Sequence, residues 1–239
     1  MVEFSNPLVR GTLIKRYKRF LADIRLDTGR TVTAHCANTG SMLSVRSAGS
    51  PVWVSPATNP NRKLKYTWEL VEVNGQLVGI NTGHPNQIVS EAIERDIIPE
   101  LSGYSSLKRE KKYGKNSRID ILLEQEGRIP CYVEVKNVTL KRNQKPNCPA
   151  EFPDAVTSRG TKHLEELSQM VRDGARSMMF YLIQRSDCSS FAIASDIDPN
   201  YANGLKLALS VGVEAACYSC NVSTTGITIQ KPIPMDLPN

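Results

Sequence analysis

Residues 118–123 (Arg118-Ile119-Asp120-Ile121-Leu122-Leu123) and 131–136 (Cys131-Tyr132-Val133-Glu134-Val135-Lys136) are two apolar, strand-like runs interrupted by charged residues. Alternate residues of a strand share one face, so Glu134 and Lys136 point to the same side of their strand. Burying a charge costs free energy unless the charge is paired or binds a metal ion. These charged positions therefore indicate a chemical site within the core of the fold.

The residues between the two runs predict an antiparallel hairpin. Gly127 lies midway between Asp120 and Glu134, so a turn over residues 125–128 brings the two carboxylates opposite each other, with their Cβ atoms about 5 Å apart. Carboxylates this close repel unless a cation bridges them, and Mg²⁺ or Mn²⁺ suits carboxylate oxygens. Asp120 and Glu134 are the predicted metal ligands and, with Lys136 beside them, the predicted catalytic residues for phosphodiester hydrolysis. A buried Lys136–Glu134 ion pair without chemistry is the alternative.

Helical and strand patterns alternate on both sides of this hairpin, which predicts an α/β domain over residues 84–239. Apolar residues at helical spacing begin at Ile88, and Pro99 ends that helix. Further helices are expected near residues 164–171 and 201–209. Strands are expected at residues 106–113, 118–125, 131–140, 177–184 and 213–218.

Residues 1–83 carry short strand patterns without a long helix. Residues 19–26 alternate between apolar and polar side chains, and Asn74-Gly75 is a strong hairpin signal. Short strands of this kind predict an OB-like closed barrel, a fold that often binds nucleic acid. The predicted fold class is therefore mixed α+β, with an N-terminal OB-like β-barrel followed by an α/β domain.

The positive charge is concentrated in the barrel. The chain of 239 residues has a formal net charge of +6; residues 1–83 hold 11 Lys+Arg against five Asp+Glu, and the remainder holds 19 of each sign. This asymmetry is typical of a protein that binds a polyanion, with a plain solvated surface as the alternative. Nearby aromatic residues such as Tyr17 and Phe20 suit base stacking, although half or more of them belong in a barrel core. The predicted nucleic-acid contacts are Lys15, Arg16, Lys18, Arg19, Arg62, Lys63, Lys65, Lys108, Lys112, Arg118 and Lys162.

Several classes of protein are disfavoured. No apolar run approaches the roughly 20 residues of a membrane helix, and the first residues lack the features of a secretory signal, so a cytoplasmic location is expected. The six cysteines are then reduced thiols. A nucleotide or sugar-phosphate enzyme is less favoured because no P-loop or GxGxxG pattern occurs.

Longer motifs allow a more specific comparison. The Asp120…Glu134-x-Lys136 arrangement resembles the PD-(D/E)XK nuclease signature. Together with Thr67-Trp68-Glu69-Leu70 and residues 13–23, 38–42, 132–140 and 152–164, it makes nearly the whole chain similar to the sugar fermentation stimulation protein family (SfsA). This resemblance implies an N-terminal OB-like domain, a C-terminal restriction-endonuclease-like domain and DNA binding without strong sequence preference. The family is also associated with regulation of bacterial sugar metabolism, notably of maltose.

By motif match, Asp120, Glu134 and Lys136 take the nuclease-like positions. A helical acid that precedes the first strand is common in that fold, and Glu91 and Glu94 both remain candidates. His163 and Lys162 are placed either to meet a phosphate at a helix N-terminus or to pack and cap. The basic stretch over residues 141–149 departs from the family pattern.

The leading interpretation is a DNA-binding protein with a divalent-metal nuclease site. A non-catalytic DNA-binding regulator is the alternative. RNA remains open as a substrate, as does the oligomeric state.

Overall fold

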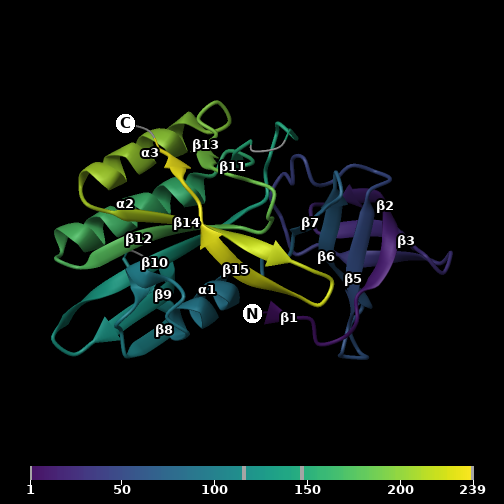
Figure 1. Cartoon of the computed structure of the whole chain (residues 1–239), viewed down its shortest axis with the longest axis horizontal. Coiled ribbons are helices and arrows are strands. Elements are labelled where there is room, and N and C mark those ends of the chain that lie inside the picture. Colours follow the sequence, from purple (N-terminus) through teal and green to yellow (C-terminus); the bar gives the residue numbers. More distant parts are fainter. Residues whose placement is uncertain (1, 115–116, 146–147, 238–239) are drawn as a thin grey trace.

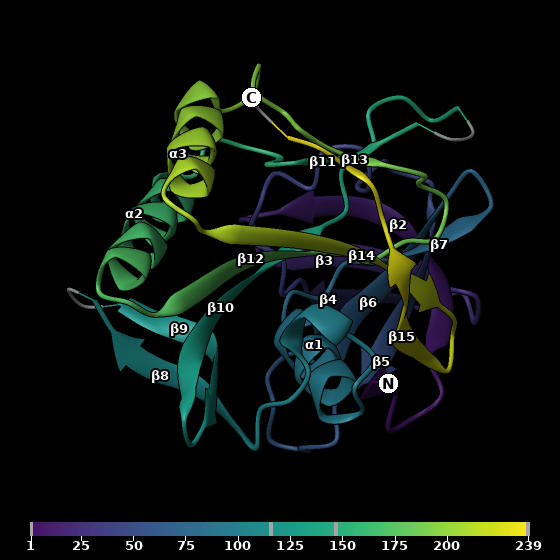
Figure 2. The same cartoon turned by 60° about the vertical axis from the view of Figure 1, so that its left-hand side comes forward.

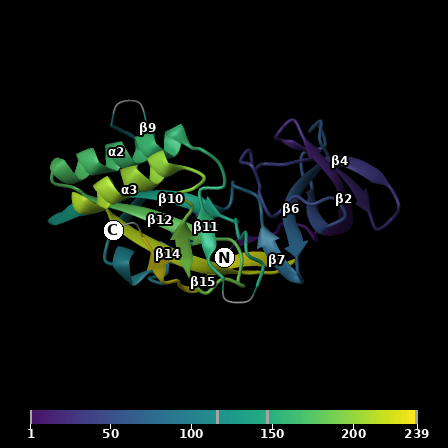
Figure 3. The same ribbon diagram turned by 90° about the horizontal axis from the view of Figure 1, so that it is seen from above.

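A computed structural model describes residues 2–114, 117–145 and 148–237 of the chain. It places a β-barrel beside a helix-covered sheet, along the long axis of the molecule (Figures 1 and 3). In the barrel, neighbouring strands follow the order β4-β3-β2-β5-β6-β7, and a further pairing between β4 and β6 closes the ring. The strands are β2 (Val9–Tyr17), β3 (Leu21–Leu26), β4 (Thr31–His35), β5 (Pro51–Pro56), β6 (Tyr66–Val73) and β7 (Gln76–Gly79).

The barrel follows from its alternating sequence. Ala22, Ile24 and Leu26 of β3 are buried, while the intervening side chains face outward. Between β6 and β7, Asn74 and Gly75 both have positive φ angles, which a two-residue hairpin of type I′ requires. These features confirm the OB-like barrel that the sequence predicts.

The second unit is built on a seven-stranded sheet with the order β1-β15-β14-β12-β10-β9-β8. Its central strands β10, β12 and β14 are parallel, whereas β8, β9 and β15 pair antiparallel with their neighbours. The strands are β1 (Val2–Glu3), β8 (Ser106–Tyr113), β9 (Ser117–Gln125), β10 (Arg128–Val138), β12 (Arg176–Ile183), β14 (Glu214–Val222) and β15 (Gly226–Pro232). A small parallel sheet adds β11 (Ala150–Phe152), β13 (Phe191–Ile193) and β16 (Met235–Asp236).

Helices cover both faces of the large sheet. Helix α1 (Pro85–Glu94) packs its apolar side against Val133 and its neighbours, and a short 3₁₀ turn, η1 (Pro99–Leu101), follows it. Helices α2 (Ser158–Arg172) and α3 (Pro199–Ser210) lie on the opposite face and share a second core with Tyr181 (Figure 2). This arrangement confirms the predicted mixed α+β fold. No helix among the described residues is long and apolar enough to span a bilayer.

The two units are tied together at their junction. Val2 and Glu3 pair with β15 of the large sheet, although they precede the barrel in the chain. The barrel residue Leu70 lies in the same core as α1, and the Gly79 N–H donates to the Gln184 carbonyl oxygen at 2.8 Å. The division of the chain after residue 83 remains a prediction, to which the structure adds that the first strand belongs with the second sheet.

Candidate active site

Beyond a β-bulge between Arg128 and Cys131, the β9–β10 hairpin has the register that the sequence predicts. Its turn consists of Glu126 and Gly127, and the pairing runs from Cys131 opposite Leu123 to Val133 opposite Ile121. One further step in this register sets Glu134 beside Asp120. At that step the backbone ladder ends, and Asp120 Oδ2 accepts a hydrogen bond from the Val135 N–H at 2.8 Å. The two strands therefore part where their carboxylates meet.

The Asp120 carboxylate is partly buried at the point of divergence. Its Oδ1 accepts a hydrogen bond from the Asn86 side-chain amide of α1 at 2.7 Å. Burial, followed by repulsion from Glu134, raises the pKa of Asp120 to about 6. A positive charge bound here would relieve both effects.

The Glu134 carboxylate is almost fully buried, with 2 % of the residue exposed. Its Oε1 accepts a hydrogen bond from Lys136 Nζ at 2.7 Å and contacts His163 Nδ1. Burial alone would raise the pKa of Glu134, but Lys136 and His163 outweigh it and lower that pKa. Among the described residues, Glu134 Oε2 is buried without a hydrogen-bond partner. One carboxylate oxygen is therefore left for a ligand.

His163 completes the polar cluster from α2. The residue is 4 % exposed, and its Nε2 lies 3.3 Å from Arg159 Nε, which donates to it. This contact assigns the ring hydrogen to Nδ1, which faces Glu134. The sequence left His163 open between phosphate binding and packing; the structure makes it a partner of Glu134. The sequence could not predict this contact, because His163 lies on a helix that is distant in sequence from Glu134.

The residue of α1 that contacts the candidate site is the amide Asn86, whereas the sequence left the acids Glu91 and Glu94 as candidates. Asn86 contacts Asp120, whereas Glu91 accepts a hydrogen bond from Gln87 and Glu94 is exposed at the end of the helix. Asn86 escaped the sequence interpretation because asparagine at the start of a helix is most simply explained by local hydrogen bonding.

The donor set fits a cation that keeps most of its water. Within residues 2–114, 117–145 and 148–237, no three His, Cys, Asp or Glu side chains converge tightly enough to cage a metal ion by themselves. Two carboxylates, one with an unused buried oxygen, suit a hard divalent ion such as Mg²⁺, which is commonly held by one or two carboxylates and several waters. Lys136 lies next to this position with 13 % of its side chain exposed.

The barrel residues predicted to meet nucleic acid have different surroundings. Lys15 is exposed, lies over the Tyr17 ring and is 3.8 Å from Asp23. In contrast, Arg16 donates to the carbonyl oxygens of Asn38 and Gly40 and thus holds the loop after β4. Phe20 is 48 % exposed, whereas Trp68 is fully buried in the barrel core. The other predicted barrel cations, Lys18, Arg19, Arg62, Lys63 and Lys65, are exposed.

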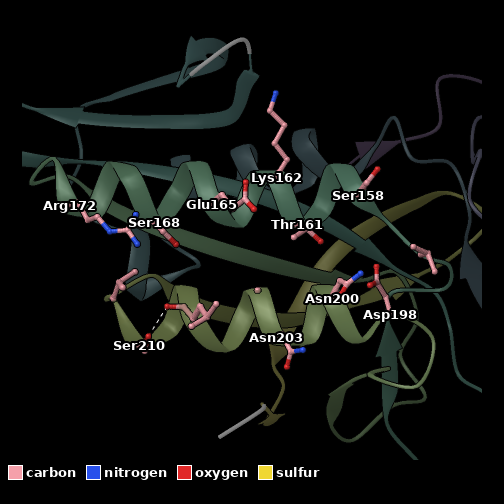
Figure 4. A pocket seen from close by; sticks show the side chains of 14 residues that line it. Ser158, Thr161, Lys162, Glu165, Ser168, Arg172, Asp198, Asn200, Asn203 and Ser210 are labelled. Carbon is pink, nitrogen blue, oxygen red and sulfur yellow. Dashed lines mark hydrogen bonds between the residues drawn. The ribbon is translucent and has the colours of Figure 1, made fainter.

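The predicted cations of the second unit lie on two elements. Lys112 and Arg118 are directly opposite each other on β8 and β9, and Lys108 pairs with Glu124 at 2.6 Å on the same strands. Lys162 projects from α2 beside a groove of about 660 Å³ between α2 and α3 (Figure 4). None of Asp120, Glu134 and Lys136 lines that groove.

Part of the basic stretch at residues 141–149 is already paired. Lys141 is buried and donates to Asp187, while Arg142 bonds both Glu151 and Asp196. Residues 146–147 of this stretch lie outside the described part of the chain.

Two protein-family models match most of the chain. A family model described as the SfsA N-terminal OB domain matches residues 14–80. A second, described as the sugar fermentation stimulation protein RE domain, matches residues 83–226. The chain belongs to the sugar fermentation stimulation protein family.

Relatives within this family match over nearly their full length. The chain is 59 % identical over 236 residues to the sugar fermentation stimulation protein homolog of Paramagnetospirillum magneticum, covering 99 % of this chain and 98 % of the relative. It is 56 % identical to the homolog of Rhodospirillum rubrum, covering 98 % of this chain and 99 % of that relative. A solved structure, Pyrococcus furiosus SfsA in complex with Ca²⁺, is similar with a TM-score of 0.88 and 28 % identity, covering 99 % of this chain and 100 % of the other. The SfsA architecture thus extends across the chain.

Proposed function

We propose that this member of the SfsA family binds DNA in the cytoplasm, largely without sequence preference, and hydrolyses phosphodiester bonds at Asp120, Glu134 and Lys136. The observation that carries the proposal is the meeting of two carboxylates and a lysine where β9 and β10 part, with Glu134 Oε2 buried and unused. A cation bound between the two carboxylates would satisfy that oxygen, and a buried polar atom without a partner otherwise costs free energy.

Asp120 and Glu134 are the residues that would hold a divalent cation, Mg²⁺ or Mn²⁺. When bound, such an ion activates water and neutralises charge on a phosphate. Lys136 Nζ lies 2.7 Å from Glu134 Oε1 and is poised to donate to a phosphate oxygen beside that carboxylate. His163 keeps Glu134 in place from α2. The relative described in complex with Ca²⁺ supports divalent-cation binding in this family.

A second candidate is a non-catalytic DNA-binding regulator of sugar metabolism, notably of maltose. The close pairing of Glu134 with both Lys136 and His163 favours it, because a carboxylate with two donors can serve as a structural centre. The positive barrel would serve either function, with RNA as an alternative polymer.

Two substitutions separate the candidates. Asp120→Asn and Lys136→Ala should each lower Mg²⁺- or Mn²⁺-dependent cleavage by roughly 100-fold or more, because charge stabilisation in the transition state is lost. Cleavage of single- and double-stranded DNA and of RNA is measured with each ion and with EDTA. Lys206→Ala, at an exposed position of α3, is the matched lysine control and should retain wild-type rates.

Activity that survives both substitutions would come from a contaminant and would contradict the proposed site. Absence of cleavage on every polymer, together with unchanged DNA affinity in the variants, would support the regulator.

A further inference from the structure

A buried carboxylate of the barrel forms a polar centre at the junction with the sheet domain. Glu69 of β6 is 4 % exposed. Its Oε1 accepts a hydrogen bond from Ser55 Oγ at 2.6 Å, and its Oε2 lies 2.8 Å from the Asn81 side-chain amide and 2.9 Å from His84 Nε2. Burial favours the neutral form, but the hydrogen bonds from His84, Ser55 and Asn81 keep the pKa of Glu69 below its ordinary value. The centre is therefore an anion that holds three donors.

One of these donors marks the start of α1. His84 is the N-cap residue, yet its side chain makes no capping hydrogen bond and reaches Glu69 instead. Pro85 follows at the first helical position, where its fixed φ angle stiffens the chain. Asn86 comes next, and its backbone carbonyl accepts a hydrogen bond from Ser90 Oγ at 2.7 Å. The contact with the barrel thus fixes where and in which direction α1 begins.

The same first turn holds Asp120. Asn86 Nδ2 donates to Asp120 Oδ1 at 2.7 Å, while the Val135 N–H holds Oδ2. Since Glu134 repels Asp120, these donors must oppose that repulsion. A displacement of Asn86 would leave the carboxylate held mainly on one oxygen.

We propose that Glu69, His84 and Asn86 form a strut through which the barrel positions Asp120. The strut consists of one hydrogen bond across the junction, the rigid first turn of α1, and one hydrogen bond to the carboxylate. These are positioning residues, and their role rests on the proposed function of Asp120 as a cation ligand. An intact barrel contact is then a requirement for cation binding in the neighbouring domain, even though no barrel residue belongs to the site.

Substitution of His84 tests the strut. His84→Ala removes the donor to Glu69, whereas the amide of His84→Gln can replace the Nε2 hydrogen. Because outer hydrogen-bond partners commonly contribute 10- to 100-fold in metal affinity, His84→Ala and Asn86→Ala should weaken Mn²⁺ binding by roughly 10-fold. His84→Gln should remain within about 3-fold of the wild type. Thr82→Val removes a different contact between the same linker and the barrel, the hydrogen bond to the Ala37 carbonyl, and should bind Mn²⁺ normally.

Two measurements on the full chain distinguish the outcomes. Calorimetric titration gives the Mn²⁺ affinity at a temperature at which each variant is folded. The amide NMR signal of Val135 reports on the Asp120 hydrogen bond without metal, and it should move in His84→Ala and Asn86→Ala but not in Thr82→Val.

Weakened Mn²⁺ binding together with this shift would support the strut. A Val135 signal unmoved by His84→Ala would overturn it and leave Glu69 as a contact that only joins the domains. Failure of the wild type to cleave any polymer would contradict the proposed function alone, because neither measurement depends on cleavage.

Discussion

Asp120 and Glu134 respond differently to burial, although both are carboxylates on neighbouring strands. Glu134 keeps its charge because Lys136 and His163 lie against it, and its pKa is lowered. Among the described residues, Asp120 has amide donors but no cation in direct contact, and its pKa rises to about 6. The unfavourable free energy of burying a negative charge is therefore borne mainly by Asp120, and not by Glu134. A divalent cation would remove this cost, which makes Asp120 the more informative position for substitution.

The raised pKa of Asp120 predicts a pH-dependent stability in EDTA. Its ordinary pKa is 3.8, so between about pH 4 and pH 6 the folded protein holds a proton that the unfolded chain has released. The free energy of unfolding contributed by this group falls as pH rises through that window. Asp120→Asn lacks the titration, so the stability of the wild type relative to this variant should fall by about 2 kcal/mol from pH 4.5 to pH 7.5.

Urea unfolding of both proteins at several pH values measures this difference. Asp236→Asn, at an exposed position of β16, is the matched control and should run parallel to the wild type. A constant difference between the wild type and Asp120→Asn across the window would show that Asp120 titrates at its ordinary pKa.

Among the elements, the β9–β10 hairpin determines which residues face each other. Its turn needs Gly127, which has a φ of 73° in the left-handed region. Gly127→Ala should destabilise the protein by about 1 kcal/mol, because a Cβ is disfavoured in that region. Gly127→Asn should cost less, since asparagine tolerates it. Apart from Gly127 and its two chain neighbours, no described residue has a heavy atom within 4 Å of a Cβ built at this position, so backbone strain alone is tested.

Thermal or urea unfolding compares the two variants. A loss in Gly127→Asn equal to that in Gly127→Ala would contradict the assignment of the cost to the φ angle. Metal binding by both variants should stay close to that of the wild type, because the strands beyond the turn keep their register.

This hairpin also shows what the sequence can predict. The hairpin follows from a short turn between two apolar strands, which are local properties, but Glu134 comes beside Asp120 only because a β-bulge between Arg128 and Cys131 shifts the register by one residue. The contacts of Asn86 with Asp120 and of His163 with Glu134 are not local, since each brings a helix from another part of the chain. Charged residues in apolar strands therefore predict where the candidate site lies, but their partners depend on helix packing that no local spacing encodes.

In the whole molecule, too, local sequence patterns predict some elements, whereas contacts between distant segments determine others. The barrel strands alternate between apolar and polar residues, and this local pattern predicts the barrel even though residues 36–50 separate β4 from β5. Strand β1 could not be predicted in the same way, because residues 2–3 pair with residues 226–227 at the other end of the chain. Two residues carry too little pattern to specify a strand, and a partner so distant adds no local signal. The same holds for the junction, where Glu69 meets residues of the linker.

The uneven charge of the molecule predicts how it should bind DNA. If exposed barrel cations contact phosphates, the affinity should fall steeply with salt because binding releases counterions. Lys15→Glu with Lys18→Glu should weaken binding to unrelated sequences to a similar extent. The slope of log affinity against log salt concentration should become shallower by about 2, since each lost phosphate contact contributes about 0.9. Arg16 is left intact, because its hydrogen bonds to the Asn38 and Gly40 carbonyls hold a barrel loop.

The matched control carries Lys206→Glu with Lys231→Glu, two exposed positions on α3 and β15 that give the same change in net charge. Fluorescence anisotropy with labelled duplexes at several salt concentrations measures affinity and slope together. A barrel-specific effect requires that the control retain most of the wild-type slope. Equal losses of DNA affinity in the two double variants would show that binding depends on the net charge of the protein alone. An unchanged slope in both would remove the barrel from the predicted DNA-binding surface, because a cation that contacts no phosphate releases no counterion when DNA binds.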